Sequence, residues 1–447
     1  MKKRVIAKIL ACTLTLAAVL TACGKSDSGS NGGSGSTGAE PGSGEEVTLT
    51  FSWWGSEERH EAMEQVAKLY EEANEGVTIK VEYGAWDGWQ QKVLTQMKGQ
   101  TEPDIMQVNY NWVHSFGKGS NVFYDLNELS SLDLSNWDAD YLKAMEVDGQ
   151  QAAVPHGMTG RVQAYNAALF EEYGLEFPTT YDEVKAAAEI IGADNTPTGA
   201  DNKYVLMTIG KECPDLYIAQ MLYNHTGKPM QTDGKINYTE AEVKEVLDLY
   251  MSLSESGAMP TFQQEDPIDN ESNPVWTSGR TGAIYEWAGT LNKYTAAYKG
   301  GDAVDELAIA PYITEDGSAP NVYVKPNLGY AVSKNSKNPE VAADFINFMF
   351  TDEEAVKALG TNLGISSNKV TNEIQVKEGM IEGKVKEAYE VLDSYEQTVI
   401  DPYFEDENVR GQRYIVIEAL RTGSVDSTEA AAEYISKQQE ELDKLYD

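Results

Sequence analysis

The stretch VTLTFSWWGSEERHEAMEQVAKLYEEANEGVTIKVEY, residues 47–83, decides the fold class. Every second residue of 47–53 is apolar, which predicts a strand, and Ser56 followed by two glutamates predicts the start of a helix. Apolar residues then recur at helical spacing in 57–73, and 77–83 alternates again as a second strand. Strand, helix and strand in this order are typical of a parallel sheet, so we expect an α/β fold.

The same alternation continues through the rest of the chain. Expected strands and helices follow at these positions: a helix over 89–97, a strand over 103–108, a strand leading to a helix over 153–174, a mainly helical region over 181–257 with a capping box at Thr239 and Glu242, strands over 281–287 and 306–312, a strand and a helix over 329–349 with Asn338 and Pro339 at the helix start, and an amphipathic helix over 427–445.

The first 46 residues are predicted to lie outside the folded part. Residues 1–22 are basic at the start and then apolar, which is typical of a secretion signal. The run Leu20-Thr21-Ala22-Cys23 resembles a bacterial lipobox, and this implies that Cys23 becomes the lipid-bearing first residue. An ordinary signal peptide with a chance cysteine is the alternative. Residues 23–46 are rich in Gly and Ser, and such a tether has an end-to-end distance of roughly 25–30 Å.

Length and charge restrict the function. About 400 residues from residue 47 suit two lobes of ordinary domain size with a cleft between them. The formal net charge is −37, from 35 basic and 72 acidic residues, which argues against binding to nucleic acid. Cys213 has no partner for a disulfide in the mature chain, and we expect it to be buried and inert.

Common catalytic motifs are missing from the sequence. There is no H-E-x-x-H, no G-x-S-x-G and no Walker loop, and the four histidines have no metal-ligand spacing. We therefore expect a protein that is not an enzyme and has no cofactor and no metal. Two alternatives stay open: a glycosidase-like carboxylate pair, and calcium bound around 192–202. Because the chain has 72 acidic residues, the presence of carboxylates is a weak signal for either site.

Several stretches together resemble the extracellular solute-binding proteins (family 1) of carbohydrate ABC importers, which include the maltose-binding proteins. They follow the family's order along nearly the whole mature chain: FSWWGSEERHEAMEQVAKLYEEA, PDIMQV, YDLNEL, VDGQQAAVPHGMTGRVQAYNAALFEEYGLEFPTTYDEV, SGRTGAIYEWAG and GYAVSKNSKNPEVAADFINFM.

The resemblance implies a two-lobed, type II periplasmic-binding-protein-like fold whose lobes are discontinuous in sequence. The first lobe is expected to take 47–155 and about 323–370, and the second 156–322 and about 371–447. The hinge is expected at VPHG, residues 154–157, and within 311–327.

The resemblance also implies ligand contacts at loops that follow the strands, as in other open α/β sheets. The implied contacts are Trp54, Glu57, Trp86, Trp89, Asn109, Tyr110 and Trp112 in the first lobe, and Arg161, Trp287, Lys325, Asn327 and Arg413 elsewhere. Tryptophan can stack on the C–H face of a sugar while polar groups bind its hydroxyls. We expect Trp53 to belong to the core, and Glu57 to serve either binding or the helix dipole.

The implied function is that of a lipid-anchored binding protein on the extracytoplasmic face of a bacterial cell membrane. It would act as a monomer, capture an oligosaccharide and deliver it to the permease subunits of an ABC transporter. The Trp-rich first lobe does not imply that the ligand is a maltodextrin. It favours a ligand that spans more than one subsite. The alternatives are a binding protein of the same fold for a peptide, a polyamine or a glycerol phosphodiester, and a secreted glycoside hydrolase.

Overall fold

The computed structural model describes residues 46–446 except 198, 209, 300–306 and 319. The predicted signal peptide, the lipidated Cys23 and the tether up to residue 45 lie outside the described residues. In the described part of the chain, every helix is too short or too polar to cross a bilayer.

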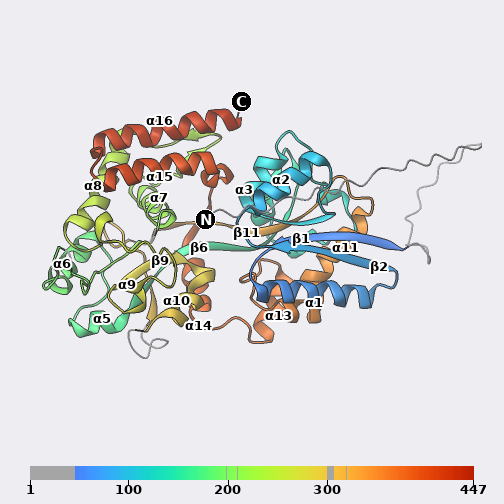
Figure 1. Ribbon diagram of the computed structural model, residues 1–447, viewed down its shortest axis with the longest axis horizontal. Helices are drawn as coiled ribbons and strands as arrows, with labels where there is room; N and C mark the ends of the chain where they lie inside the picture. Colours follow the sequence, from blue (N-terminus) through green and yellow to red (C-terminus); the bar gives the residue numbers. More distant parts are fainter. Residues whose placement is uncertain (1–45, 198, 209, 300–306, 319, 447) are drawn as a thin grey trace, which may run out of the picture. The chain divides into compact units, whose positions relative to one another are not determined.

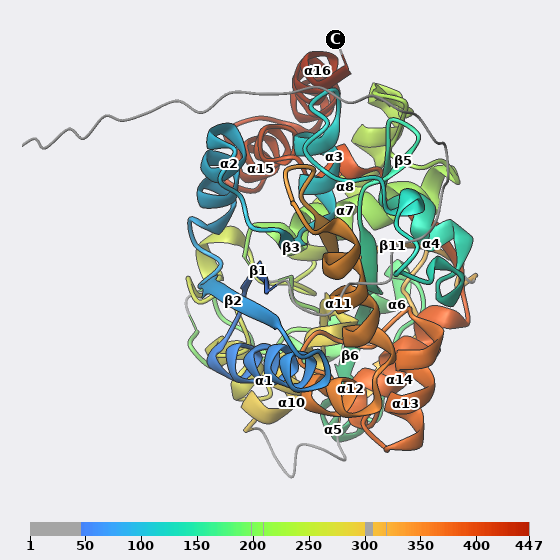
Figure 2. The same cartoon turned by 90° about the vertical axis from the view of Figure 1, so that its right-hand side faces the viewer.

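The first lobe is built on three parallel strands, as the opening stretch predicts. β1 pairs in parallel with β2 from Val47 opposite Val77 to Trp54 opposite Gly84, and β3 pairs in parallel with the other edge of β1. Figures 1 and 2 show α1 on one face of these strands and α2 and α3 on the other. The elements are β1 (Val47–Trp54), α1 (Glu57–Ala73), β2 (Val77–Gly84), α2 (Trp89–Gly99), β3 (Ile105–Val108) and α3 (Tyr110–Gly117).

Strand alternation decides what each face of β1 packs against. Leu49, Phe51 and Trp53 are fully buried, and Phe51 packs against Phe345 with ring centroids 5.2 Å apart. The expectation that Trp53 belongs to the core is therefore confirmed. Trp54 follows directly and points to the opposite face, because successive side chains of a strand alternate.

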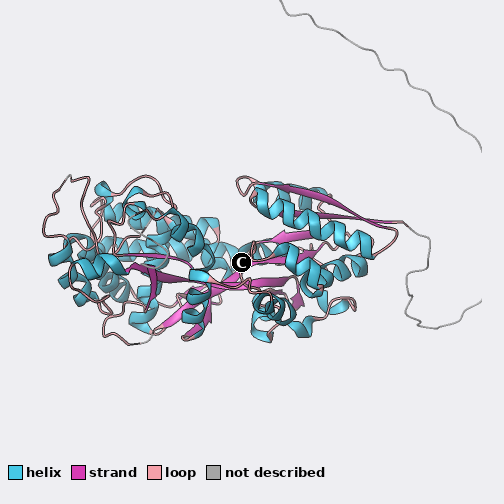
Figure 3. Ribbon diagram, turned by 90° about the horizontal axis from the view of Figure 1, so that it is seen from below, coloured by secondary structure: helices cyan, strands magenta, loops and turns pink. Residues whose placement is uncertain are grey.

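Two long antiparallel strands connect the halves of the fold. β6 (Val154–Asn166) pairs with β11 (Asn321–Val332), and the sheet order is β10-β6-β11-β3-β1-β2, with β9 on β6 and β12 on β11. Figure 3 shows these strands in magenta among the helices. The register shifts on both sides of Leu328. There the Asn327 side chain accepts from the Gly157 amide (3.1 Å) and donates to the Leu363 carbonyl oxygen (2.7 Å).

Further helices and short strands lie between β3 and β6 and after β11. Before β6 come η1 (Leu126–Glu128), η2 (Leu134–Asn136), α4 (Ala139–Ala144), β4 (Glu146–Val147) and β5 (Gln150–Gln151). After β11 come α11 (Pro339–Thr351), α12 (Glu353–Leu359), α13 (Lys369–Lys377), α14 (Gly383–Asp393), β12 (Glu396–Val399), η5 (Pro402–Glu405), α15 (Glu407–Arg421) and α16 (Ser427–Tyr446). Asn338 and Pro339 start α11 as predicted, although the Asn338 side chain forms no capping hydrogen bond.

The middle of the chain is rich in helices, with a small hairpin and two further strands among them. The predicted capping box of Thr239 and Glu242 is present at the start of α8. A small hairpin, β7 with β8, precedes it and turns at Asp233-Gly234, both with positive φ, as two-residue hairpin turns require. The elements are α5 (Ala167–Glu172), α6 (Tyr181–Ile191), α7 (Glu212–Thr226), β7 (Gln231–Thr232), β8 (Lys235–Ile236), α8 (Glu240–Glu255), η3 (Phe262–Gln264), α9 (Pro274–Thr277), β9 (Ala283–Trp287), η4 (Ala288–Thr290), α10 (Leu291–Ala297) and β10 (Leu307–Ala310).

Two large separate hydrophobic cores define two lobes. One core takes residues of 49–154 and 328–363, and the other takes residues of 158–324 and 385–434. β6 and β11 contribute to both cores, so they are the strands that cross between the lobes. The fold is therefore a two-lobed α/β fold whose lobes are discontinuous in sequence. The residue bounds that we expect for the two lobes stay a prediction.

Candidate functional site

The carboxyl ends of the three parallel strands carry an aromatic cluster. Trp54 is the last residue of β1, Trp86 follows β2, and Trp112 lies in the first turn of α3, which follows β3. Parallel strands end at the same edge of a sheet, so these three side chains meet there. We call Trp54, Trp86 and Trp112 the tryptophan cluster.

The tryptophan cluster has one exposed face. The Trp86 and Trp112 rings stack with an interplanar angle of 10° and centroids 5.3 Å apart, and Trp54 packs on both at 5.2 and 5.0 Å. Trp112 is 1% exposed and Trp54 is 8% exposed, whereas Trp86 is 46% exposed. The two buried rings therefore support Trp86 in a fixed orientation and leave part of its surface open to solvent.

The other predicted contacts of the first lobe lie around this cluster in different environments. Glu57 is exposed at the first position of α1, and Trp89 is buried at the start of α2 with Lys92 Nζ 4.2 Å from its ring centroid. Asn109 precedes α3, and its buried Oδ1 has no hydrogen-bond partner. The Tyr110 hydroxyl donates to the Ile400 carbonyl oxygen (2.7 Å), and burial, with nearby carboxylates, raises its pKa well above the usual value.

Strand register brings together three predicted contacts, Arg161, Trp287 and Lys325, which we call the second group. Arg161 on β6 is the direct cross-strand partner of Trp287 on β9, and Lys325 on β11 is opposite Thr159, two residues before Arg161. Opposite residues and residues two apart share one face of a sheet. The Trp287 ring centroid accordingly lies 4.9 Å from the Arg161 guanidinium carbon and 4.5 Å from Lys325 Nζ.

Carboxylates neutralise both cations of this second group. Arg161 Nη1 donates to the Tyr285 carbonyl oxygen (2.8 Å) and to Glu286 (3.2 Å), and its Nη2 lies 3.4 Å from Glu212. Burial is the largest single effect and opposes the charge of Arg161, but Glu286, Glu212 and neighbouring groups together raise the pKa of the guanidinium, which stays charged. The Lys325 ammonium forms an ion pair with Glu405.

Glu405 and Asn111 connect the second group to the first lobe, and the sequence interpretation missed both. Asn111 Nδ2 donates to the Glu405 backbone oxygen (3.1 Å), and Asn111 is the immediate neighbour of Trp112. Glu405 Oε1 and Asn111 Oδ1 are buried and have no hydrogen-bond partner. Asn111 could have been found from its position in the aromatic loop after a strand, whereas no local signal marks Glu405.

Asn327 and Arg413 have partners that belong to the fold. Asn327 binds backbone groups at the crossing strands, as described above. Arg413 is fully buried on α15 and forms a bidentate ion pair with Asp215 (2.6 and 3.0 Å), and it also donates to the Phe404 carbonyl oxygen (2.8 Å). The structure therefore does not bring Arg413 into contact with Arg161, Trp287 or Lys325 in any described interaction.

A cavity of about 400 Å³ lies in the second lobe beside α15, and residues such as Lys211, Phe262 and Tyr414 line it. None of the predicted contact residues belongs to its lining. Within the described ranges, no three or more His, Cys, Asp or Glu side chains are grouped so that they could hold a metal ion.

Two α/β lobes with aromatic and polar side chains at the strand ends define a protein that binds a solute. The chain belongs to the family of bacterial extracellular solute-binding proteins, whose profile matches residues 54–356. This confirms the resemblance that the sequence motifs indicate.

Relatives and solved structures agree with this assignment. The chain is 22% identical over 363 residues to the diacetylchitobiose-binding protein DasA of Streptomyces coelicolor, and the match covers 79% of each chain. A periplasmic solute-binding protein from Pectobacterium atrosepticum has a TM-score of 0.80 and 27% identity, covering 90% of this chain and 100% of its own. A periplasmic oligogalacturonide-binding protein from Yersinia enterocolitica, solved with saturated digalacturonic acid, has the same fold with a TM-score of 0.78, 24% identity and the same coverages.

Proposed function

We propose that this protein is a lipid-anchored receptor that captures an oligosaccharide outside the bacterial membrane and delivers it to the permease of an ABC transporter. The observation that carries the proposal is the tryptophan cluster, in which a partly exposed Trp86 is stacked on buried Trp112. A flat, supported indole ring is suited to the C–H face of a pyranose.

Polar atoms near the cluster support the same ligand class. Asn109 Oδ1, Asn111 Oδ1 and Glu405 Oε1 are buried acceptors without partners, and a buried polar atom that lacks a hydrogen bond costs about 1–3 kcal/mol. Sugar hydroxyl groups would satisfy these acceptors. Relatives whose names or titles include a sugar ligand, diacetylchitobiose in one and digalacturonic acid in another, add support by analogy.

The proposed contacts are the tryptophan cluster together with Asn109, Arg161, Trp287 and Lys325 from the predicted set. Glu405 and Asn111 are added to this set from the geometry of the structure. Binding would proceed by rotation of the lobes about β6 and β11, as in other hinged binding proteins, and without turnover of the sugar.

A ligand screen tests the proposal. The purified protein is tested by thermal shift and by tryptophan fluorescence against oligosaccharides, amino acids, peptides, polyamines and glycerol phosphodiesters. We expect stabilisation by at least one oligosaccharide and no new reducing ends after overnight incubation. Stabilisation only by another class would falsify the carbohydrate assignment, and new reducing ends would indicate a hydrolase.

A further inference from the structure

The two positive charges around Trp287 are already paired with carboxylates of the protein. Arg161 contacts Glu286 and Glu212, and Lys325 contacts Glu405, so three carboxylates face two cations. An added anionic group would have to compete with carboxylates that are fixed in place. Displacing one partner of a buried ion pair leaves an uncompensated charge, which is strongly unfavourable.

A third cation near the tryptophan cluster is also engaged. Arg59 Nη1 donates to the Trp54 carbonyl oxygen (3.2 Å), and its Nη2 donates to the Asn362 carbonyl oxygen (3.0 Å). Both terminal nitrogens of this guanidinium therefore bind backbone groups. The fork geometry with which arginine usually receives a carboxylate is directed at the protein itself.

The atoms without partners in this region include both acceptors and donors. Glu405 is 6% exposed and Asn111 is 9% exposed, and each has one buried oxygen without a hydrogen bond, as does Asn109. Arg161 Nε, Arg59 Nε and Trp89 Nε1 are buried donors without a partner. The acceptors, one of them a carboxylate oxygen, need O–H or N–H groups and the donors need oxygen acceptors, so hydroxyl groups, which donate and accept, suit the whole set.

We infer that the solute is an oligosaccharide without acidic groups, either neutral or amino-substituted, and that Glu405 is the residue that discriminates against uronic acids. This inference rests on the proposed function, because it assumes that a sugar binds between the tryptophan cluster and Trp287. It separates this protein from the structural neighbour solved with digalacturonic acid.

Matched pairs of sugars test the inference. Trisaccharides based on glucose, galactose and mannose are each measured by calorimetry in neutral form and after oxidation of C6 to the uronate, and a glucosamine trisaccharide is added. We expect a neutral or amino trisaccharide to bind, and the corresponding uronate to bind at least tenfold more weakly. The neutral and amino arms show which donor group the site prefers.

The outcomes separate the two proposals. Uronates that bind as tightly as, or more tightly than, their neutral forms would overturn the inference and leave the proposed function intact. No binding by any trisaccharide would overturn both.

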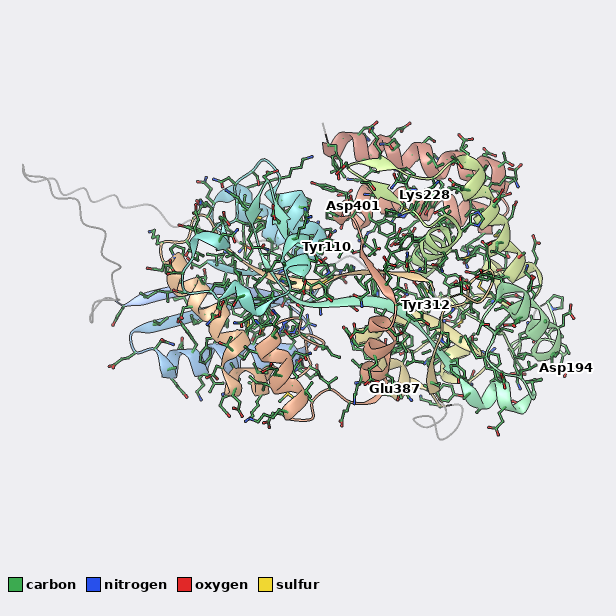
Figure 4. All side chains as sticks on the ribbon, turned by 180° about the vertical axis from the view of Figure 1, so that it is seen from behind. Tyr110, Asp194, Lys228, Tyr312, Glu387 and Asp401 are labelled. Carbon is green, nitrogen blue, oxygen red and sulfur yellow. The ribbon has the colours of Figure 1, made fainter. Side chains whose placement is uncertain are left out.

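A charge variant gives a second, independent measurement. Glu405→Gln removes the carboxylate that pairs with Lys325, so the uronate should gain at least tenfold relative to the neutral sugar. Glu387→Gln is the matched control, since Glu387 pairs with Lys384 on α14, where Figure 4 labels it. An equal change of the ratio in both variants would show that Glu405 has no specific role.

Discussion

Replacing Trp86 by alanine is the most direct perturbation of the proposed site. The ring lies on the surface of the tryptophan cluster, and its remaining exposed area is what a sugar would cover. Trp112 and Trp54 beneath it stay in place, so the variant removes a platform and leaves the strands that support it. We expect weaker ligand binding and a cooperative unfolding transition.

The magnitude follows from the exposed fraction. Trp86 is 46% exposed, which for a side chain of about 200 Å² corresponds to about 90 Å² that a stacked sugar could bury. At about 25 cal/mol per Å² this area is worth about 2 kcal/mol, or a roughly 30-fold rise in Kd. A value of this size is also typical of aromatic hot spots at interfaces.

Isothermal titration with the sugar found in the screen measures the effect, and Tyr83→Ala serves as the matched control. Tyr83 is 40% exposed and lies in the same lobe, but it stacks on His60 and donates to Glu64, away from the tryptophan cluster. The control should bind the sugar as the parent does. A Trp86→Ala protein with an unchanged Kd would refute the stacking argument.

Three further predictions concern stability and localisation. Arg413→Met leaves Asp215 buried without its partner and should cost about 3–5 kcal/mol in urea unfolding, and a smaller loss would mean that the pair is not needed. Burial, aided by Arg59, lowers the pKa of His156 from 6.5 to about 3, so only the unfolded chain takes up this proton between those values. Stability is then full above pH 6.5 and falls below it, by about 2 kcal/mol from this residue at pH 5.0, and His156→Leu should lack that part of the pH dependence. Cys23→Ser should release the protein from membranes without changing its affinity in solution, and unchanged retention in a fractionation experiment would contradict the lipid anchor.

Local sequence patterns predicted the elements of the fold well because each pattern needs only near neighbours. Alternation over 47–54 and 77–83 and helical spacing over 57–73 gave β1, β2 and α1 with nearly the observed bounds. The Trp53 and Trp54 pair shows the same logic at the level of single residues, since alternation places the two rings on opposite faces of β1, where Trp53 packs on Phe51 and Trp54 packs on Trp86 and Trp112.

Pairing between distant charges could not be predicted in the same way. Lys325 meets Glu405 because β12, which η5 follows, pairs with β11, and Arg161 meets Glu286 because β9 pairs with β6. The identity of the neighbouring strand is a property of topology, and it is absent from any local window of sequence. The sequence therefore marks Arg161 and Lys325 as cations, and only the fold shows that carboxylates pair with them.

The helix α3 connects the tryptophan cluster to the segment 400–405. It carries Trp112 of the tryptophan cluster, and its Tyr110 and Asn111 side chains donate to backbone oxygens of Ile400 and Glu405. Figure 4 labels Tyr110 beside Asp401, which follows Ile400. Each such bond contributes about 1 kcal/mol, so a rotation about β6 and β11 either carries the segment 400–405 with the first lobe or breaks both bonds. Because the Glu405 side chain holds Lys325, a rotation that moves segment 400–405 also moves the ion pair beside Trp287, and in the proposed binding mode α3 couples the contacts of the two lobes.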